Sequence, residues 1–347
     1  MWSGMVGNVV EDEFLIHSVP CQNHQWCPSP RAQMLASISK RIVQMILTLV
    51  LASSVIFVLI HLSGDPTQGF MPAGASPEVR DATRARLGLD DPLAEQYIRF
   101  VVNGLTGNFG DSWRDRQPAL DAVLDRLPAT MLLAGTSLAI AVVGGTLIGV
   151  VSASSRSNLL LNAVKVIPVA GQAVPTFWLG AMLMLLFAVR LGWLPSSGNA
   201  TLSALVLPAL TLASQPGSII ARLISTGMRD LGRSDFARTA ESKGLAAATI
   251  SVRHILPNAV LPVLAYVGLQ AGFLIGGAVV VESVFAWPGI GRLALQSAVQ
   301  RDLPVIHAFV VVTAIGVIVI NLLVDILRLV IDPRQRTPGS GVVVANG

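Results

Sequence analysis

Long apolar runs recur along this chain and leave few folds open to it. Each run has about 20 residues, enough at 1.5 Å of rise per residue for a helix to cross a hydrocarbon core of about 30 Å. We expect six such spans, at about 41–62, 129–151, 166–190, 204–226, 256–281 and 305–331. The strands of an outer-membrane barrel would show short segments of alternating hydrophobicity instead. The chain is therefore predicted to be an all-α polytopic membrane protein.

Charge along the chain orients these spans. Only 13% of the residues are charged, against roughly 25% in typical soluble proteins. Loops rich in Lys and Arg stay in the cytoplasm because these residues resist translocation. The basic residues beside the spans are Lys40, Arg41, Arg156, Lys165, Arg229, Arg233, Arg238, Lys243, Arg253, Arg334 and Arg336. These residues all lie on the cytoplasmic side of the membrane if both termini are cytoplasmic. The same rule accounts for the net charge of +4, so this charge does not indicate binding to nucleic acid.

The segments between the spans complete the expected organisation. The expected parts are a disordered tail over 1–38, a first transmembrane helix over 39–62, an external loop over 63–128, a transmembrane core over 129–336 and a tail over 337–347. The external loop is long enough for small helices: Glu78–Leu87 is polar, Pro92–Leu105 has apolar residues at helical spacing, and Pro118 is placed to begin a third helix. We expect a partly folded external cap.

The first 33 residues do not share the pattern of the rest. They lack the positive region and apolar core of a signal peptide, and Met34 begins a plausible native start. We expect an upstream start or a dispensable tail. The alternative is a zinc or nickel site made by His17, Cys21, His24 and Cys27.

Two glycine patterns resemble nucleotide-binding loops without their context. Gly227–Ser234 carries Arg in place of the required Lys and has no strand before it. Gly289–Ala294 fits G-x-G-x-x-A but follows Trp287-Pro288 outside any βαβ unit. The motifs of zinc proteases and serine hydrolases are also missing. We expect no enzyme activity, no cofactor and no resident metal.

Several amide and hydroxyl side chains fall at membrane depth. Such residues usually face the interior of the helix bundle, where they bond neighbouring helices or line a polar pathway. Both roles remain open here. The candidates for a translocation path are Gln172, Thr176, Gln215, Asn258 and Gln270.

A polar, basic stretch from Arg229 to Pro257, the 229–257 loop, joins the fourth and fifth spans. We expect Asp235 to cap a helix over Phe236–Lys243, and Gly244 to allow a sharp turn. A second helix, about Ala246–Arg253, should lead to the membrane.

The first of these helices is predicted to meet another protein. It would present three polar side chains outward, those of Arg238, Thr239 and Ser242. Small residues would let a partner surface come close: Ala237, Ala240 and Ala246–Ala248. A loop of this length without a function is uncommon.

The sequence DFARTAESKGLAAATISVRHILPNAVLPVL resembles the coupling loop of binding-protein-dependent ABC importer permeases, E-A-A-x3-G-x9-I-x-L-P. Ala240, Gly244 and Leu256-Pro257 fit this pattern. Arg238 and Thr239 replace its Glu-Ala, and His254 stands where Ile is expected. The Arg-Thr variant is similar to the dipeptide, oligopeptide and nickel branch.

Further stretches in the same order resemble that branch. They are LGLDDPLAEQYIRF from Leu87, DRLPATMLL from Asp125, VPTFWLGAMLMLLFAVRLGWLPSSG from Val174, VESVFAWPGIGRL from Val281 and NLLVDILRLVIDPR from Asn321. The resemblance covers about Ser39–Arg336. It implies the type I permease fold with six transmembrane helices in the cell (inner) membrane.

The resemblance also implies partners and a site. A second homologous permease subunit would pair with this chain in the lipid bilayer, two ATPase subunits would dock beneath, and an external solute-binding protein would deliver the cargo. The residues implied in ATPase coupling are Arg238, Thr239, Ala240, Lys243, Gly244, Leu256 and Pro257.

The cargo and two other classes of function stay open on the sequence. Di- or oligopeptides are the expected cargo, with nickel chelates and glutathione-type molecules as alternatives. A stand-alone carrier would favour charged residues in mid-membrane, and an intramembrane enzyme would need a catalytic pair at depth.

Overall fold

The computed structural model describes residues 47, 50, 51, 53–55, 57, 58, 76–86, 88–154, 171–199 and 201–331. The chain divides into two compact units, one of Met1–Leu47 with Leu329–Gly347 and the other of Thr48–Arg328. Apart from residues 47 and 329–331, the described residues belong to the second unit. Both expected tails, the alternative metal cluster near residue 20 and most of the expected first span lie outside the described residues.

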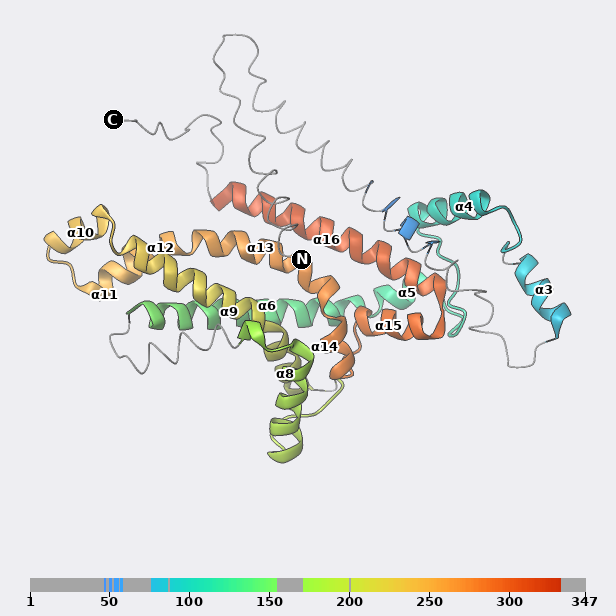
Figure 1. The fold of residues 1–347 in the computed structure, drawn as a ribbon, viewed down its shortest axis with the longest axis horizontal. Helices are drawn as coiled ribbons and strands as arrows, with labels where there is room; N and C mark the ends of the chain where they lie inside the picture. Colours follow the sequence, from blue (N-terminus) through green and yellow to red (C-terminus); the bar gives the residue numbers. More distant parts are fainter. Residues whose placement is uncertain are drawn as a thin grey trace, which may run out of the picture. The chain divides into compact units, whose positions relative to one another are not determined.

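The described residues are mostly helical, with one isolated β-bridge among them between Asp111 and Pro118 (Figure 1). The helices are α3 (Pro77–Arg86), α4 (Leu93–Thr106), α5 (Ala119–Leu124), α6 (Leu127–Ser154), α8 (Thr176–Leu183), η2 (Met184–Arg190), η3 (Leu202–Leu205), α9 (Val206–Leu231), α10 (Asp235–Ser242), α11 (Ala247–Thr249), η4 (Ile250–Ile255), α12 (Leu256–Ala259), α13 (Leu261–Gly277), α14 (Val279–Val284), α15 (Ile290–Gln300) and α16 (Leu303–Ile331). The three helices expected between the first two spans are confirmed as α3, α4 and α5.

Three continuous helical segments of the described chain are long and apolar enough to cross a membrane: Ala119–Ser154, Leu202–Leu231 and Leu303–Val324. A fourth is broken, with Ala247–Ala259 and Leu261–Leu274 meeting at 44°. The three continuous segments confirm the second, fourth and sixth expected spans, and the bent pair overlaps the fifth. The described part of the third is residues 171–190, which include the shorter apolar helix Thr176–Arg190.

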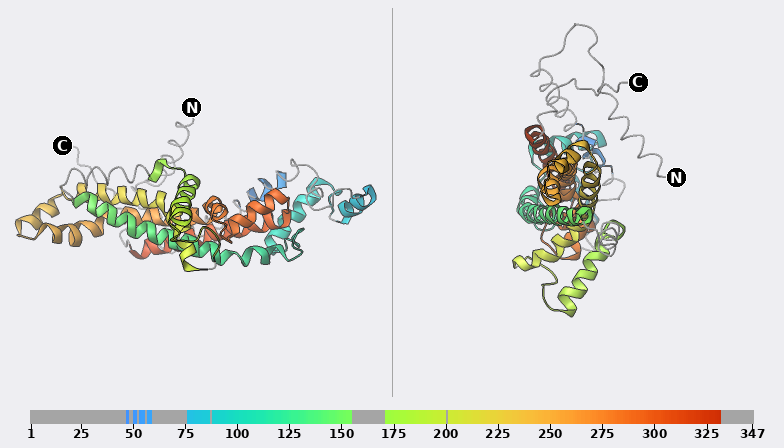
Figure 2. Two further views of the ribbon diagram at one scale, coloured as in Figure 1. Left: turned by 90° about the horizontal axis from the view of Figure 1, so that it is seen from below. Right: turned by 90° about the vertical axis from the view of Figure 1, so that its left-hand side faces the viewer.

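The centre of the second unit is the pair α6 and α9, which pack against each other along their length and can be followed in the left view of Figure 2. Gly145 and Gly149 of α6 make this packing possible. A Cβ atom at Gly145 would lie 2.6 Å from the carbonyl oxygen of Gly217, and one at Gly149 would lie 2.6 Å from Cβ of Ile224. Spacing of four residues puts both glycines on one face, as in the G-x-x-x-G motif of membrane helices. The two backbones are therefore in direct contact.

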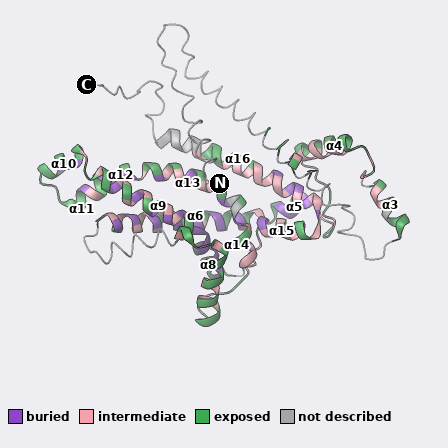
Figure 3. Cartoon of the chain, viewed as in Figure 1, coloured by how far each residue is buried: buried purple, intermediate pink, exposed green. Residues whose placement is uncertain are grey.

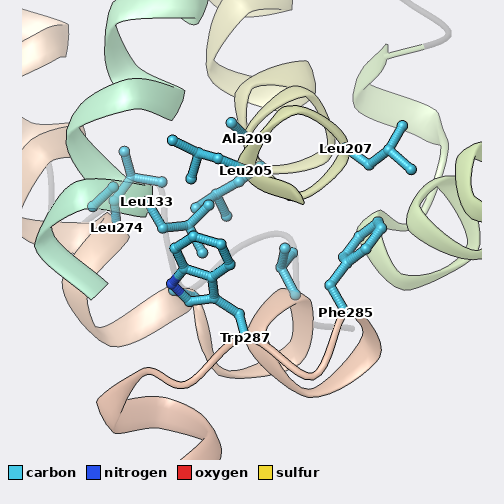
Figure 4. Close-up of a cluster of buried hydrophobic side chains, with 11 residues drawn as sticks. Leu133, Leu205, Leu207, Ala209, Leu274, Phe285 and Trp287 are labelled. Carbon is cyan, nitrogen blue, oxygen red and sulfur yellow. The ribbon is translucent and has the colours of Figure 1, made fainter. Parts of the chain in front are cut away.

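A second region of the core joins the helices at the N-terminal end of α9 (Figure 4). Phe285 and Trp287 are 1% and 3% exposed and lie among apolar side chains of α6, η3, α9 and α13. The indole Nε1 of Trp287 donates to the carbonyl oxygen of Ala129, 2.9 Å away, so the buried ring has its polar partner. Burial follows the same helices in Figure 3, where purple is dense on α6 and α9.

Candidate functional site

The 229–257 loop continues α9 and begins with the short helix α10. Ser234 occupies its N-cap position without a side-chain cap bond, and its hydroxyl donates to the carbonyl oxygen of Leu231 at 2.5 Å. The expected cap at Asp235 is therefore wrong. Asp235 is the first helical residue, where its carboxylate favours the positive end of the helix dipole. The helix expected over Phe236–Lys243 is confirmed to within one residue at each end.

Gly244 makes the sharp turn that ends α10. Its φ is 75°, in the left-handed region that glycine adopts without strain. The N–H of Gly244 donates to Glu241 O at 2.9 Å and that of Leu245 to Ala240 O at 3.3 Å, the two bonds of a Schellman motif. Its two chain neighbours apart, no atom of the described residues lies within 4 Å of where a Cβ would stand. Glycine is needed here for its conformation, as the sequence predicted, and not for space.

The alanines of α10 face inward. Ala237 and Ala240 are 1% and 8% exposed. They pack in a buried cluster with residues of α9 and η4: Met228, Ile250 and Ile255. The expectation that these two alanines open to a partner protein is wrong, because α10 folds back on η4 and uses its smallest side chains for that contact. Ala240, expected among the coupling residues, contributes packing, while Ala246–Ala248 are exposed as expected.

Enlarging the inner face of α10 should loosen it from η4. In Ala237→Leu, three additional carbon atoms enter a filled site, at a cost of about 1–3 kcal/mol. We expect more proteolysis at Arg238 and a lower unfolding temperature in detergent. The matched control is Ala248→Leu, at an exposed alanine of the same loop. Wild-type proteolysis and a wild-type unfolding temperature in Ala237→Leu would contradict the packing role.

The outer face of α10 combines charge with apolar surface. Arg238, Thr239 and Lys243 are exposed, while Phe236 and Leu245 are 42% and 40% exposed. The Arg238 guanidinium lies 3.8 Å from the Asp235 carboxylate, an exposed pair that contributes little to stability. These groups are available to a partner.

From α11 onward the helix enters the expected fifth span without a loop. The wide turns of η4 precede Pro257, which has no N–H to donate to the previous turn. Leu256 is half-buried against the same apolar cluster as α10, and Pro257 is exposed. Pro262, the second residue of α13, accounts for the 44° bend before it. The second loop helix therefore runs past its expected end at Arg253.

The loop is also tied to the end of α6. The Nη2 of Arg229 donates to the carbonyl and hydroxyl oxygens of Ser152, both at 3.2 Å. A cation at the last turn of α6 also suits the negative end of that helix. Between α6, α9, α10 and η4 lies a crevice of about 300 Å³ whose lining includes Arg233 and Glu241.

The expected path residues do not lie at one level. Gly171 packs against Ser214 and Ser218 of α9, which puts the neighbouring Gln172 at the level of Gln215; both glutamines are exposed. Thr176, at the start of α8, and Gln270, on α13, are half-buried.

Asn258 lies elsewhere. Its neighbour Ala259 packs on Gly227 of α9, about 18 Å along the helix from Gln215. The Asn258 Nδ2 donates to its own helix, to the carbonyl oxygen of His254 at 2.8 Å.

A buried acid at the opposite end of α6 was not predicted from the sequence. Glu282 of α14 is 0% exposed. The Thr130 hydroxyl donates to its Oε1 at 2.6 Å and the backbone N–H of Arg292 to its Oε2 at 2.9 Å. The N–H of Ile290 in turn donates to Thr130 Oγ1 at 2.9 Å. These bonds, the Glu282 node, join α6, α14 and the start of α15.

The glycines of the G-x-G-x-x-A pattern allow the backbone to pack closely against the Glu282 node. A Cβ at Gly289 would overlap the Glu282 carboxyl group, and one at Gly291 would lie 2.8 Å from Cα of Val279. Both positions are thus limited to glycine by close approach. The signal in the sequence was Glu282 itself, an acid inside an apolar run just before Trp287-Pro288.

A second buried polar contact lies near the same end. Asp302 is 4% exposed and precedes α16. Its Oδ2 accepts a bond from the Ser112 hydroxyl at 2.5 Å, and its Oδ1 one from the N–H of Trp113 at 3.2 Å. The segment between α4 and α5 is therefore fixed to the start of α16.

Residues 145–337 match the model of a protein family described as the binding-protein-dependent transport system inner membrane component, a match over more than half of the chain. The chain belongs to this family of importer permeases. Residues 34–134 of the permease match the companion N-terminal model of the same transport systems.

Curated relatives agree with the assignment. The permease is 38% identical over 304 residues to the glutathione transport system permease protein GsiC of Escherichia coli strain K12, covering 87% of this chain and 99% of the relative. The protein of the same name from Shigella dysenteriae serotype 1 (strain Sd197) matches to the same extent.

A solved structure supports the fold. The MetNI methionine ABC transporter, in an inward facing conformation, matches with a TM-score of 0.52 and 19% identity, over 60% of this chain and 96% of that chain. Identity at that level shows the fold alone. The permease is a subunit of an ABC importer in the inner membrane, has the type I fold and is not itself the catalytic subunit.

Proposed function

We propose that the outer face of α10 and the turn at Gly244 receive the motion of a partner ATPase. The observation that carries this proposal is the arrangement of α10: charged and apolar groups point outward, while two buried alanines seat the helix on η4. A helix held in this way moves as one body with what lies beneath it. Arg238, Thr239 and Lys243 are the contact residues in this proposal.

The motion would pass from α10 into the spans by two connections. One is the short link from α10 to α9, and the other is the packing of α10 on η4, which continues through α12 to the bend before α13. Because α9 touches α6 backbone to backbone at Gly145 and Gly149, displacement of α9 moves α6 with it. Leu256 and Pro257 sit where the second connection enters the membrane.

The proposed assembly has a second homologous permease subunit, two ATPase subunits on the side of α10 and a solute-binding protein on the other side. In that arrangement both termini are cytoplasmic and residues 63–128 are external. Gln172 and Gln215, at one level of α9 and both exposed, are the best candidates for lining the path between the two permeases.

The proposed cargo is a short peptide of the glutathione type. Support comes from curated relatives that are named for glutathione transport, which favours the glutathione-type alternative over the di- or oligopeptides expected first from the sequence. A nickel chelate is the runner-up, and the branch of the family that the loop resembles includes nickel importers.

Calorimetry on the cognate binding protein tests the cargo. We expect it to bind glutathione or another di- or tripeptide and not a nickel chelate. The same solute should then enter proteoliposomes that hold the full transporter, only with the ATPase subunits and ATP present. Binding of the nickel chelate alone would overturn the peptide proposal, and uptake without the ATPase would indicate a stand-alone carrier.

A further inference from the structure

Helix α4 divides into three faces of different chemistry. One face packs on the protein, a second is exposed and apolar, and a third is exposed and polar. None of its residues is fully buried, and Figure 3 shows it in green and pink only. At helical spacing the exposed apolar residues form one strip, the α4 strip, made by Ile98, Val102 and Leu105, which are 62%, 50% and 67% exposed.

The packed face holds α4 beside two other helical segments. The Tyr97 and Ser54 hydroxyls are 2.7 Å apart, and the Phe57 and Tyr97 rings meet edge to face at 5.4 Å. The Phe100 ring stacks on that of His307, in the second turn of α16, at 3.5 Å. α4 is therefore a fixed part of this end of the bundle.

The positions of these contacts along α16 show that α4 lies beside the apolar stretch of α16. Gly104 and Leu105 line a crevice of about 90 Å³ with Val311 and Ile315, which lie about 6–12 Å further along α16 than His307. α16 is one of the membrane-spanning helices. Because Leu105 and the 46% exposed Ile315 share this crevice, the α4 strip continues into the exposed apolar surface of a membrane span.

The polar face completes the pattern. Glu95, Arg99 and Thr106 lie next to the α4 strip and are exposed. Arg99 donates to the Asp91 carboxylate at 2.6 Å and lies 3.5 Å from Glu95, so the positive charge of this face is paired within the chain. A helix with one apolar and one charged exposed face is the kind that lies in a membrane interface.

We propose that α4 is an interfacial helix whose strip Ile98, Val102 and Leu105 contacts lipid acyl chains in the leaflet away from α10. The polar face then lies at the headgroups, and the third face anchors the helix to α16. In a segment otherwise expected outside the membrane, α4 thus fixes the depth at which the permease sits.

Spin labels at single cysteines test this placement. The background is Cys21→Ser with Cys27→Ser, which removes both native cysteines, and the full transporter is reconstituted in phosphatidylcholine–phosphatidylglycerol vesicles. Labels at Ile98→Cys, Val102→Cys and Leu105→Cys should collide more with oxygen than with a water-soluble nickel chelate. Their depths should be about 5–10 Å into the headgroup–acyl boundary.

The matched controls are Glu95→Cys and Thr106→Cys, on the polar face of the same helix. Labels there should collide more with the nickel chelate. Each variant is first checked for assembly and ATP-dependent uptake, so that folding is not in question. Low collision with both reagents at the α4 strip would mean that protein covers it, and high collision with the nickel chelate would mean an aqueous surface; either result overturns the proposal.

Discussion

Gly244→Pro should leave the transporter assembled and hydrolysing ATP but unable to couple hydrolysis to uptake. Proline holds φ near −65°, whereas Gly244 has a φ of 75°. The substitution also removes the N–H that donates to Glu241 O and disfavours the conformation of the preceding Lys243, which has a φ of −81° and a ψ of 2°. The turn would have to open at a cost of about 3 kcal/mol or more, and α10 would lose its defined end.

We expect uptake to fall about tenfold or more, because a loss of about 1.4 kcal/mol in coupling free energy corresponds to a factor of ten. Uptake and ATPase activity are measured on the same proteoliposomes, each normalised to the amount of assembled complex. The matched control is Gly192→Pro, at another glycine with a positive φ and open space around it, outside the 229–257 loop. It should keep the ratio of uptake to hydrolysis. Wild-type uptake in Gly244→Pro at normal expression would remove Gly244 from the coupling proposal.

Glu282→Ala should strongly destabilise the folded permease. It leaves the N–H of Arg292 without its acceptor and deprives the Thr130 hydroxyl of its partner in a fully buried site. Together with the cavity that the truncated side chain leaves, the lost hydrogen bonds should lower the free energy of unfolding by about 2–5 kcal/mol. We expect less folded permease extracted from membranes and a lower unfolding temperature in detergent.

Two comparisons separate the Glu282 node from a general effect of losing an acid. Glu282→Gln keeps the volume and one acceptor and should be intermediate, while Glu78→Ala, on the exposed surface of α3, should match the wild type. Because Thr130 and Glu282 act in one network, the effect of combining Thr130→Val with Glu282→Ala should be smaller than the sum of the single effects. An unfolding temperature equal to that of the wild type in Glu282→Ala would show that the node does not stabilise the fold.

The sequence was most informative where one physical requirement acts locally. Hydropathy located the spans because crossing a membrane needs a minimum apolar length. Gly244 was identified as the turn of the loop because only glycine adopts a positive φ freely at a helix end. The helices α4 and α5 were predictable from spacing and from the proline that precedes each of them.

The sequence was least informative where distant residues decide the outcome. From the sequence, small alanines on α10 could pack against a partner protein or against η4 of the same chain. Ala237 and Ala240 pack against η4 because the loop folds back on itself. Glu282 has a partner 152 residues away in Thr130, a separation that no local pattern reveals. The bend before α13 likewise depends on how Pro262 is accommodated within the bundle.

Helix α6 is clamped at both ends and joined to α9 along its middle. Thr130 holds its first turn in the Glu282 node, Arg229 holds its last turn at Ser152, and Gly145 and Gly149 lie between them. Because α6 is held at both ends and along its middle, it cannot bend independently of its neighbours. We therefore expect α6 and α9 to move together as one rigid body. In the proposed importer cycle we therefore expect bending at the 44° break between Ala259 and Leu261, and a substitution that stiffens this break should slow transport.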